Sequence, residues 1–408
     1  METLRFLMVS THFPPLHLGG DAIFVDYLSR ELIKRGHEVD VLHSPAAYEL
    51  LRKRTAAPPA KALEGGPTVH HFTSRLGRMS PLMALTLGRW SQAERALRQL
   101  ADRLKPDVVH WHNTRGFIGR PFPIAGALSL YTVHDYTPVC PRSTLLRPSM
   151  RVCEEPVLCT VCCMRWRKPP QLWRTGGRRV LRYHPDLKLL SPSEFVAKQL
   201  AEDGVTVHRV LRGFVPDLAQ TYGLSESVDE SIVYLGLLEK HKGVEVLLDA
   251  FIRTRNEQGF RLRILGEGTL RTKLRLTANQ SGVSDRVETP GFLPRKEVEQ
   301  LRRNAVAQIV PSTWYENAPS TALEAYSLGV PVVASDIGGL PEIVDASAGS
   351  KIFRPGDSRQ LGEILVSLWN DRGSMAEAKR KARRAYETRF RPDIHVDEYL
   401  KLVKESVS

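Results

Sequence analysis

The segment that decides the fold runs from Pro311 to Glu342 and reads PSTWYENAPSTALEAYSLGVPVVASDIGGLPE. Residues 307–312, which overlap its start, predict a buried strand that runs into a loop. The run from Pro319 to Gly329 predicts a helix that ends at glycine, and residues 330–335 predict the next buried strand. This order of strand, helix and strand is typical of a parallel α/β sheet.

Two carboxylates, Glu316 and Glu324, flank the start of the predicted helix. The first N–H groups of a helix carry partial positive charge and suit a phosphate, and open α/β sheets bind ligands beyond the carboxyl ends of their strands. Glu324 is placed to reach hydroxyl groups of such a ligand. A structural interpretation stays open, because Thr321 and Glu324 have the spacing of a helix capping box and Glu316 has the place of a solvated loop residue.

Length and composition favour a globular protein with two domains. The 408 residues are long for one core, and two domains of roughly 200 residues are the natural expectation. No apolar run approaches the roughly 20 residues of a membrane span, and the first residues lack the layout of a signal peptide. We therefore expect a cytoplasmic protein with reduced thiols.

Strand and helix patterns alternate in both halves of the chain. The predicted strands of the first half are residues 4–10, 38–43, 107–112, 128–134 and 187–191, and those of the second half are residues 231–236, 261–266, 307–310 and 330–335. Continuous apolar strands separated by helices predict an α/β fold with two doubly wound parallel sheets. The boundary between the halves is expected near residues 210–231, where polar and turn residues interrupt the pattern.

Residues 141–182 carry ten basic and two acidic side chains, which concentrates much of the net charge of +13 in one segment. Trp166 and Trp173 lie among the basic residues. Basic and aromatic residues together indicate contact with an anionic membrane surface or with a phosphorylated partner. The alternative is a solvated basic face that keeps the protein soluble. Nucleic acid is not an expected partner, because no recognised binding motif is present.

Five cysteines fall in or beside this basic segment. Cys140, Cys153, Cys159 and Cys162 are separated by 12, 5 and 2 residues, and Cys163 follows. In a reducing compartment such clustering predicts a structural zinc held by the four thiolates. The alternative is a set of small buried apolar side chains. A catalytic metal is not expected there, because four thiolates leave no open coordination position.

The segment that opens this section resembles the signature of the retaining glycosyltransferases of family 4, which have the GT-B architecture. The shared features are Pro311-Ser312, the pair Glu316 and Glu324, the run GVPVVA at residues 329–334 and the run GGLPE at residues 338–342. The resemblance implies two Rossmann-like domains that face a cleft. Residues 1–210 would bind the acceptor and carry the cysteine-rich insertion at about 140–182, residues 211–380 would bind a nucleotide sugar, and residues 381–408 would cross back as a helix.

The resemblance also implies roles for individual residues. Glu316 would hold hydroxyls of the donor sugar and balance developing positive charge, Glu324 would bind ribose, and Lys242 would bind the diphosphate. His134, at the end of a predicted strand, would orient the sugar from the opposite domain. The other implied donor-binding positions are Gly19, Gly20, Gly236, Asn317, Ala318, Pro319, Ser320 and Thr321.

Each of these positions also has a structural interpretation. Taken alone, Gly19-Gly20 is a turn, a lone histidine at a strand end is most often structural, and Lys242 is a surface lysine. The chain also departs from the family pattern, because Leu237 stands where the family usually has an arginine. Lys240 and His241 are the neighbouring candidates to supply the missing cation.

The predicted function is that of a retaining glycosyltransferase that moves a sugar from a UDP-sugar or GDP-sugar to an acceptor hydroxyl without a catalytic cofactor. The acceptor would be a saccharide, and the basic segment favours a lipid-linked or phosphorylated one at the inner face of the cell membrane. Three alternatives stay open: a GT-B sugar-nucleotide epimerase, a non-catalytic sugar-nucleotide binder, and a Rossmann oxidoreductase. The last is disfavoured because the sequence lacks a G-x-G-x-x-G fingerprint.

Overall fold

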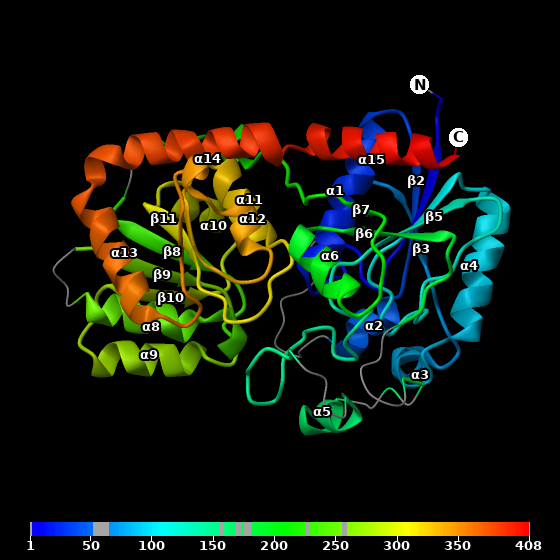
Figure 1. The fold of residues 1–408 in the computed structure, drawn as a ribbon, viewed down its shortest axis with the longest axis horizontal. Coiled ribbons are helices and arrows are strands. Elements are labelled where there is room, and N and C mark those ends of the chain that lie inside the picture. The colour runs from blue at the N-terminus through cyan, green and yellow to red at the C-terminus, as the bar shows by residue number, and fades with distance from the viewer. Residues whose placement is uncertain are drawn as a thin grey trace. The chain divides into compact units, whose positions relative to one another are not determined.

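The chain folds into two compact units, each built on a parallel sheet (Figure 1). The structure is a computed structural model that describes residues 2–51, 65–154, 159–168, 171, 173–174, 181–225, 229–254 and 259–407. The first unit comprises Met1–Arg212 with Pro392–Ser408, and the second comprises Gly213–Arg391. The chain therefore leaves the first unit once and returns to it at its last helix.

The first unit contains a seven-stranded sheet in the order β3-β2-β1-β4-β5-β6-β7, and every pair of neighbouring strands is parallel. Its strands are β1 (Arg5–Val9), β2 (Glu38–His43), β3 (Thr68–His71), β4 (Val108–Trp111), β5 (Leu128–Thr132), β6 (Leu187–Ser191) and β7 (Arg209–Val210). Its α-helices are α1 (Gly20–Lys34), α2 (Pro45–Leu51), α3 (Ser80–Leu87), α4 (Ser91–Leu104), α5 (Cys159–Arg165), α6 (Glu194–Ala201) and α15 (Pro392–Val407).

The second unit contains a six-stranded parallel sheet in the order β10-β9-β8-β11-β12-β13. Its strands are β8 (Ser231–Leu235), β9 (Arg261–Leu265), β10 (Val287–Gly291), β11 (Ala307–Val310), β12 (Val332–Ser335) and β13 (Lys351–Phe353). Its α-helices are α7 (Leu218–Tyr222), α8 (Val244–Arg253), α9 (Arg271–Gln280), α10 (Arg295–Arg303), α11 (Ser320–Ser327), α12 (Leu340–Ile343), α13 (Ser358–Asn370) and α14 (Met375–Arg389).

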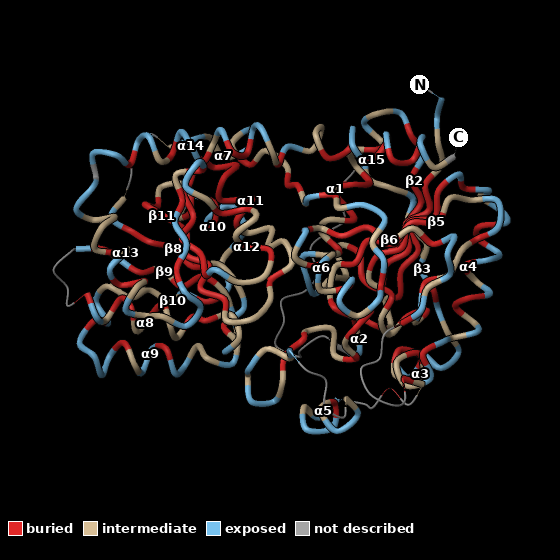
Figure 2. Tube along the Cα trace, in the orientation of Figure 1, coloured by how far each residue is buried: buried red, intermediate tan, exposed pale blue. Residues whose placement is uncertain are grey.

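The central strands of both sheets are buried on both faces (Figure 2). In β1, the residues from Phe6 to Val9 have no exposed surface, and the same holds for Ile232 and Val233 in β8. Parallel sheets need such continuous apolar strands, because helices cover both of their faces. This confirms the predicted fold class of two doubly wound, Rossmann-like parallel sheets.

Each sheet has two more strands than the apolar pattern predicts. The added strands are β3 and β7 in the first sheet and β10 and β13 in the second, and all four lie at the sheet edges. Edge strands pair on one side only and are partly exposed, so they do not need a continuous apolar run. The sequence VETPG of β10 includes a proline and a glutamate and illustrates this point.

The last helix, α15, packs within the first unit beside α1 (Figure 1). The hydroxyl of Tyr399 lies 3.0 Å from Nδ1 of His110 in β4. Nδ1 of His395 donates a hydrogen bond to the carbonyl oxygen of Arg212 at 2.7 Å. Arg35, at the end of α1, pairs with Asp397. The first unit is therefore built from two stretches that are far apart in the sequence.

Within the described residues, no helix combines the length and the apolar character that crossing a bilayer requires.

Candidate active site

The centre of the candidate site is an ion pair between Lys242 and Glu316. Lys242 lies in the turn after β8, and Glu316 lies in the loop after β11. Because β8 and β11 are parallel neighbours in the sheet, their carboxyl ends meet at one edge. Nζ of Lys242 lies 2.7 Å from Oε1 of Glu316, so the structure brings together two predicted site residues that are far apart in the sequence.

Two further side chains hold the carboxylate of Glu316. Oε1 accepts hydrogen bonds from the hydroxyl of Ser312 at 2.6 Å and from Nε1 of Trp314 at 2.8 Å. Burial alone would raise the pKa of Glu316, but Lys242, Ser312 and Trp314 together hold the pKa below its ordinary value. The side chain is therefore ionised and fixed at neutral pH. The roles of Ser312 and Trp314 were not predicted from the sequence.

Glycines let the surrounding backbone come close to this pair. Gly338 has φ +65°, and a Cβ at this position would lie 2.4 Å from the carbonyl oxygen of Glu316. The amide of Gly339 donates to that same oxygen at 2.7 Å. Gly243 has φ +70°, and a Cβ there would lie 1.7 Å from the carbonyl oxygen of Pro311. Only glycine meets both demands at Gly243 and Gly338.

The amino-terminal end of α11 adjoins Glu316 in sequence. Pro319 is the N-cap residue, and no side chain caps the helix. The capping-box interpretation of Thr321 and Glu324 is therefore wrong. Residues Asn317, Ala318, Pro319, Ser320 and Thr321 are all partly exposed, so this stretch is accessible to a ligand.

Glu324 takes part in a buried ion-pair network rather than standing alone. Oε1 lies 3.0 Å from Arg295, and Oε2 lies 3.1 Å from Arg302, which is 1% exposed. Arg302 also pairs with Glu299 at 2.9 Å and donates to the carbonyl oxygen of Thr321 at 2.9 Å. A carboxylate has about four lone-pair sites, so Glu324 keeps capacity for further hydrogen bonds.

Gly236 follows β8 directly and lies against another glycine. A Cβ at Gly266, which has φ +136°, would lie 2.0 Å from the carbonyl oxygen of Gly236. The next residue, Leu237, is 56% exposed and brings no charge to the position where the family usually has arginine. Of the two candidate replacements, His241 packs its ring edge-on against Trp314 with centroids 4.9 Å apart.

The other predicted site residues lie in the first unit, at the carboxyl ends of its strands. Gly19 is the N-cap residue of α1, Gly20 is the first residue of that helix, and both are exposed. Asp21, in the first turn, accepts a hydrogen bond from Nδ2 of Asn113 at 3.1 Å. The same carboxylate lies near His134, where it counteracts part of the pKa decrease of the imidazole. Gly19, Gly20 and His134 therefore belong to one neighbourhood.

His134 is held between two aromatic neighbours. Its Nε2 lies 2.9 Å from Nδ1 of His112, and its ring lies edge-on to Phe24 with centroids 5.3 Å apart. Burial lowers the pKa of His134 to about 4, although Asp21 opposes the shift. The imidazole is thus neutral at physiological pH. A neutral ring offers one hydrogen-bond donor and one acceptor, rather than a positive charge.

The structure does not support the predicted structural zinc. Cys140, Cys153, Cys159 and Cys162 are partly buried, and Cys163 is buried. No group of three or more histidine, cysteine, aspartate or glutamate side chains within the described part of the chain is arranged to hold a metal ion. Burial, with a further contribution from Cys140, raises the pKa of Cys162, which disfavours the thiolate that zinc requires. The cysteine spacing therefore predicted a metal site that the described residues do not form.

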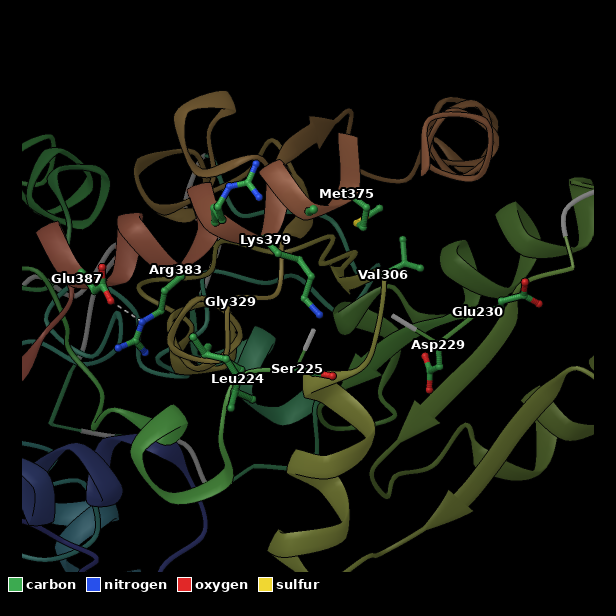
Figure 3. Close-up of a pocket in the computed structure, with 13 residues that line it drawn as sticks. Leu224, Ser225, Asp229, Glu230, Val306, Gly329, Met375, Lys379, Arg383 and Glu387 are labelled. Carbon is green, nitrogen blue, oxygen red and sulfur yellow. Dashed lines mark hydrogen bonds and ion pairs between the residues drawn. The ribbon is translucent and has the colours of Figure 1, made fainter. Parts of the chain in front are cut away.

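A separate pocket of about 760 Å³ lies near the amino-terminal ends of β8 and β11 (Figure 3). Asp229, Val306 and the α14 residues Met375 and Lys379 contribute to its wall. Burial lowers the pKa of Lys379, whose Nζ donates to the carbonyl oxygen of Arg303 at 3.1 Å. None of the described residues that line this pocket is a predicted site residue, so the pocket is distinct from the candidate site.

Two family models match the chain in consecutive stretches. Glycosyltransferase Family 4 matches residues 18–218, and Glycosyl transferases group 1 matches residues 223–385. The two matches together span most of both units. The chain is thus a glycosyltransferase, and it belongs to the GT-B glycosyltransferases of the family 4 type.

Individual proteins are similar over different lengths. The glycogen synthase of Mycobacterium tuberculosis is 28% identical over 411 residues, which cover 94% of this chain and 89% of that protein. The putative colanic acid biosynthesis glycosyltransferase WcaL of Escherichia coli is 32% identical over 171 residues, which cover 40% of this chain and only 42% of WcaL. The crystal structure of Anabaena HepE with UDP and glucose has a TM-score of 0.66 at 16% identity, and it covers 98% of this chain and 100% of that one. At this identity the structural likeness shows the fold alone.

Proposed function

We propose that the protein is a retaining glycosyltransferase that transfers a sugar from a nucleoside-diphosphate sugar to the hydroxyl of an acceptor saccharide. The observation that carries the proposal is the ionised pair of Lys242 and Glu316, fixed at the carboxyl edge of the second sheet. Lys242 supplies a cation for a departing diphosphate, and Glu316 supplies a carboxylate for sugar hydroxyls. The two groups lie within hydrogen-bonding distance of each other. No other pair of predicted site residues offers both charges at one place among the described residues.

The chemistry requires electrostatic stabilisation more than a strong base. Cleavage of the glycosidic bond leaves negative charge on the diphosphate and positive charge on the sugar. Preorganised donors placed where charge develops commonly supply the largest catalytic effect. Lys242 would stabilise the leaving phosphate, together with the backbone amides of Ala318, Ser320 and Thr321 and of Gly19-Gly20. Glu316 would hold donor hydroxyls and balance the positive charge.

The remaining roles follow from the environment of each side chain. Glu324 would bind ribose hydroxyls with the lone pairs that Arg295 and Arg302 leave available. His134 would orient the donor sugar as a neutral hydrogen-bonding ring, because its pKa of about 4 excludes a charged imidazole at neutral pH. Gly236 would let the nucleotide approach the backbone after β8. We assign no general base from the protein.

The known relatives support a saccharide acceptor and a nucleotide-sugar donor. The matched proteins include a glycogen synthase and a putative glycosyltransferase of colanic acid biosynthesis, and both names refer to the synthesis of saccharides. HepE, which shares the fold, was solved with UDP and with UDP-glucose. A uridine donor is therefore the first to test, and GDP-sugars are the second.

The decisive experiment combines a donor screen with analysis of the product. Thermal shifts with UDP-, GDP- and ADP-sugars identify the donor, and NMR of the purified product gives the anomeric configuration. We expect stabilisation by one nucleotide class and retention of configuration. Inversion would overturn the retaining mechanism. Incubation with donor alone separates the alternatives, because an epimerase would interconvert the donor sugar without any acceptor.

A further inference from the structure

A second histidine, His112, lies behind His134 and has no role in the proposed transfer. It follows β4, two residues beyond His110, and has no exposed surface. Its Nδ1 lies 2.9 Å from Nε2 of His134, and the two ring planes are inclined by 25° with centroids 5.2 Å apart. A buried pair of imidazoles at the candidate site raises the question of which ring donates the shared proton.

Both rings are neutral, so the shared hydrogen bond contains one proton. Burial lowers the pKa of His112 well below its ordinary value, and burial lowers that of His134 to about 4. In a neutral imidazole one nitrogen is a donor and the other is an acceptor. The direction of the bond between the rings therefore fixes the tautomer of both residues.

The second nitrogen of His112 indicates this direction. Nε2 of His112 is buried and has no hydrogen-bond partner among the described residues. A proton on Nε2 would leave an unpaired buried N–H group, whereas a proton on Nδ1 is used in the bond to His134. Unpaired buried N–H groups are the rarer defect in folded proteins. The network thus assigns Nδ1 of His112 as the donor and Nε2 of His134 as the acceptor.

The charge of Asp21 acts on the same ring. With Nε2 accepting, His134 must carry its own proton on Nδ1. The carboxylate of Asp21 lies close enough to favour protonation of the His134 ring, and Asn113 holds that carboxylate in place.

The orientation of the His134 ring is fixed as well as its tautomer. Phe24 of α1 lies edge-on to His134, and the ring of Phe24 also contacts His395 of α15, with centroids 5.5 Å apart. His395 is anchored by its hydrogen bond to the carbonyl oxygen of Arg212. These aromatic contacts leave the His134 ring little freedom to rotate away from His112.

We propose that His112 is a positioning residue that holds His134 in the tautomer with its proton on Nδ1, so that His134 presents an N–H donor to a hydroxyl of the transferred sugar. The role of the tautomer in transfer rests on the proposed function, whereas the tautomer itself is a property of the protein without ligand. The two parts can therefore be tested separately.

The test of the tautomer uses the unmodified protein, one variant of His134 for signal assignment and two variants of His112. Long-range ¹H–¹⁵N spectra of protein labelled with ¹⁵N-histidine report which ring nitrogen carries the proton, and His134→Gln identifies the His134 signals by their loss. We expect a proton on Nδ1 of His134 in the native protein. His112→Leu removes the donor and should populate the other tautomer, whereas His112→Asn keeps an N–H close to the position of Nδ1 and should restore the native one.

Transfer kinetics provide the second readout. His112→Leu should lower kcat/KM by about tenfold, the usual effect of one lost hydrogen bond, and His112→Asn should recover most of it. A native His134 protonated on Nε2, or a tautomer unchanged in His112→Leu, would overturn the proposal, and the first result needs no variant to fold. A tautomer change in His112→Leu with unaltered kinetics would support the positioning by His112 and refute the role of His134 in the proposed function.

Discussion

The guanidinium of Arg302 lies 3.1 Å from the carboxylate of Glu324, and this contact joins the helix α11 to the helix α10. Arg302 also pairs with Glu299, and all three side chains are almost fully buried. Arg302 compensates the charge of both buried carboxylates, and the half-exposed Arg295 also pairs with each of them. Its removal leaves those carboxylates in an unfavourable environment.

Arg302→Met should therefore destabilise the second unit strongly. Breaking a buried ion pair by removal of one partner costs about 3–5 kcal/mol. Urea unfolding of the variant measures the loss. Arg359→Met is the matched control, because Arg359 pairs with Glu363 at an exposed surface, where the effect should be close to zero. Equal stability of the two variants would contradict the importance of the buried network.

Loss of either member of the pair Lys242 and Glu316 should abolish most transfer. Lys242→Ala and Glu316→Gln should each lower kcat by about 100-fold to 1,000-fold, the usual effect of removing one preorganised electrostatic group. Initial rates with a saturating donor measure this decrease. Lys273→Ala is the control, because Lys273 forms an exposed pair with Glu245 in the same unit. Near-normal turnover in either site variant, with the fold intact by circular dichroism, would refute the assigned role.

Gly338→Ala should displace the loop that carries Glu316. The added Cβ would lie 2.4 Å from a backbone oxygen of Glu316, and backbone cannot rotate away as a flexible side chain can. We expect a loss of transfer comparable to that of Glu316→Gln. Gly356→Ala separates this clash from backbone strain, because Gly356 also has a positive φ of +81° but has nothing near its Cβ position. A similar decrease in both variants would show that strain alone is responsible.

Acidification should destabilise the first unit through His395. Burial lowers the pKa of His395 to about 4, whereas in the unfolded chain it titrates near 6.5. As the pH falls from 6.5 to 4, the unfolded chain binds a proton that the folded one does not, so stability present above pH 6.5 is lost. The loss is up to about 1.4 kcal/mol per pH unit from this residue.

Unfolding midpoints measured between pH 7 and pH 4 test this expectation. His395→Asn keeps a donor for the Arg212 carbonyl oxygen but does not titrate, so its stability should fall less steeply with decreasing pH. His184→Asn is the control, because the His184 side chain is 55% exposed. Parallel pH profiles for native protein and His395→Asn would contradict the role of His395.

The sequence predicts the buried centre of each sheet better than its edges. β2, β6 and β11 have the predicted bounds, because continuous apolar runs mark strands that are covered on both faces. β3 and β10 were missed because partly exposed edge strands tolerate histidine, glutamate and proline. The position of an edge strand depends on its single neighbour, and that neighbour is known only after folding.

The sequence predicts the candidate-site residues that stand in recognisable motifs. It does not predict those that only the packing of the helices brings to the site. Glu316 and Lys242 stand in recognisable motifs, and the structure places them 2.7 Å apart. Arg302 lies in RKEVEQLRR, which looks like a solvated charged helix, and only the packing of α10 shows that Arg302 and Glu299 face inward. The cysteines show the opposite error, a site that was predicted but not formed. Their spacing along the chain does not bring a set of metal ligands together within the described residues.

The return of α15 to the first unit has a consequence for biosynthesis. Tyr399 contacts His110, which lies 289 positions earlier in the chain. His395 contacts Arg212, which lies 183 positions earlier. During synthesis, the surface of the first unit that α15 covers therefore stays exposed until the whole second unit has been made. The second unit is continuous in sequence and can fold during this time. Completion of the first unit is thus among the last events of folding, and shortening of the tail would damage the part of the protein that was synthesised first.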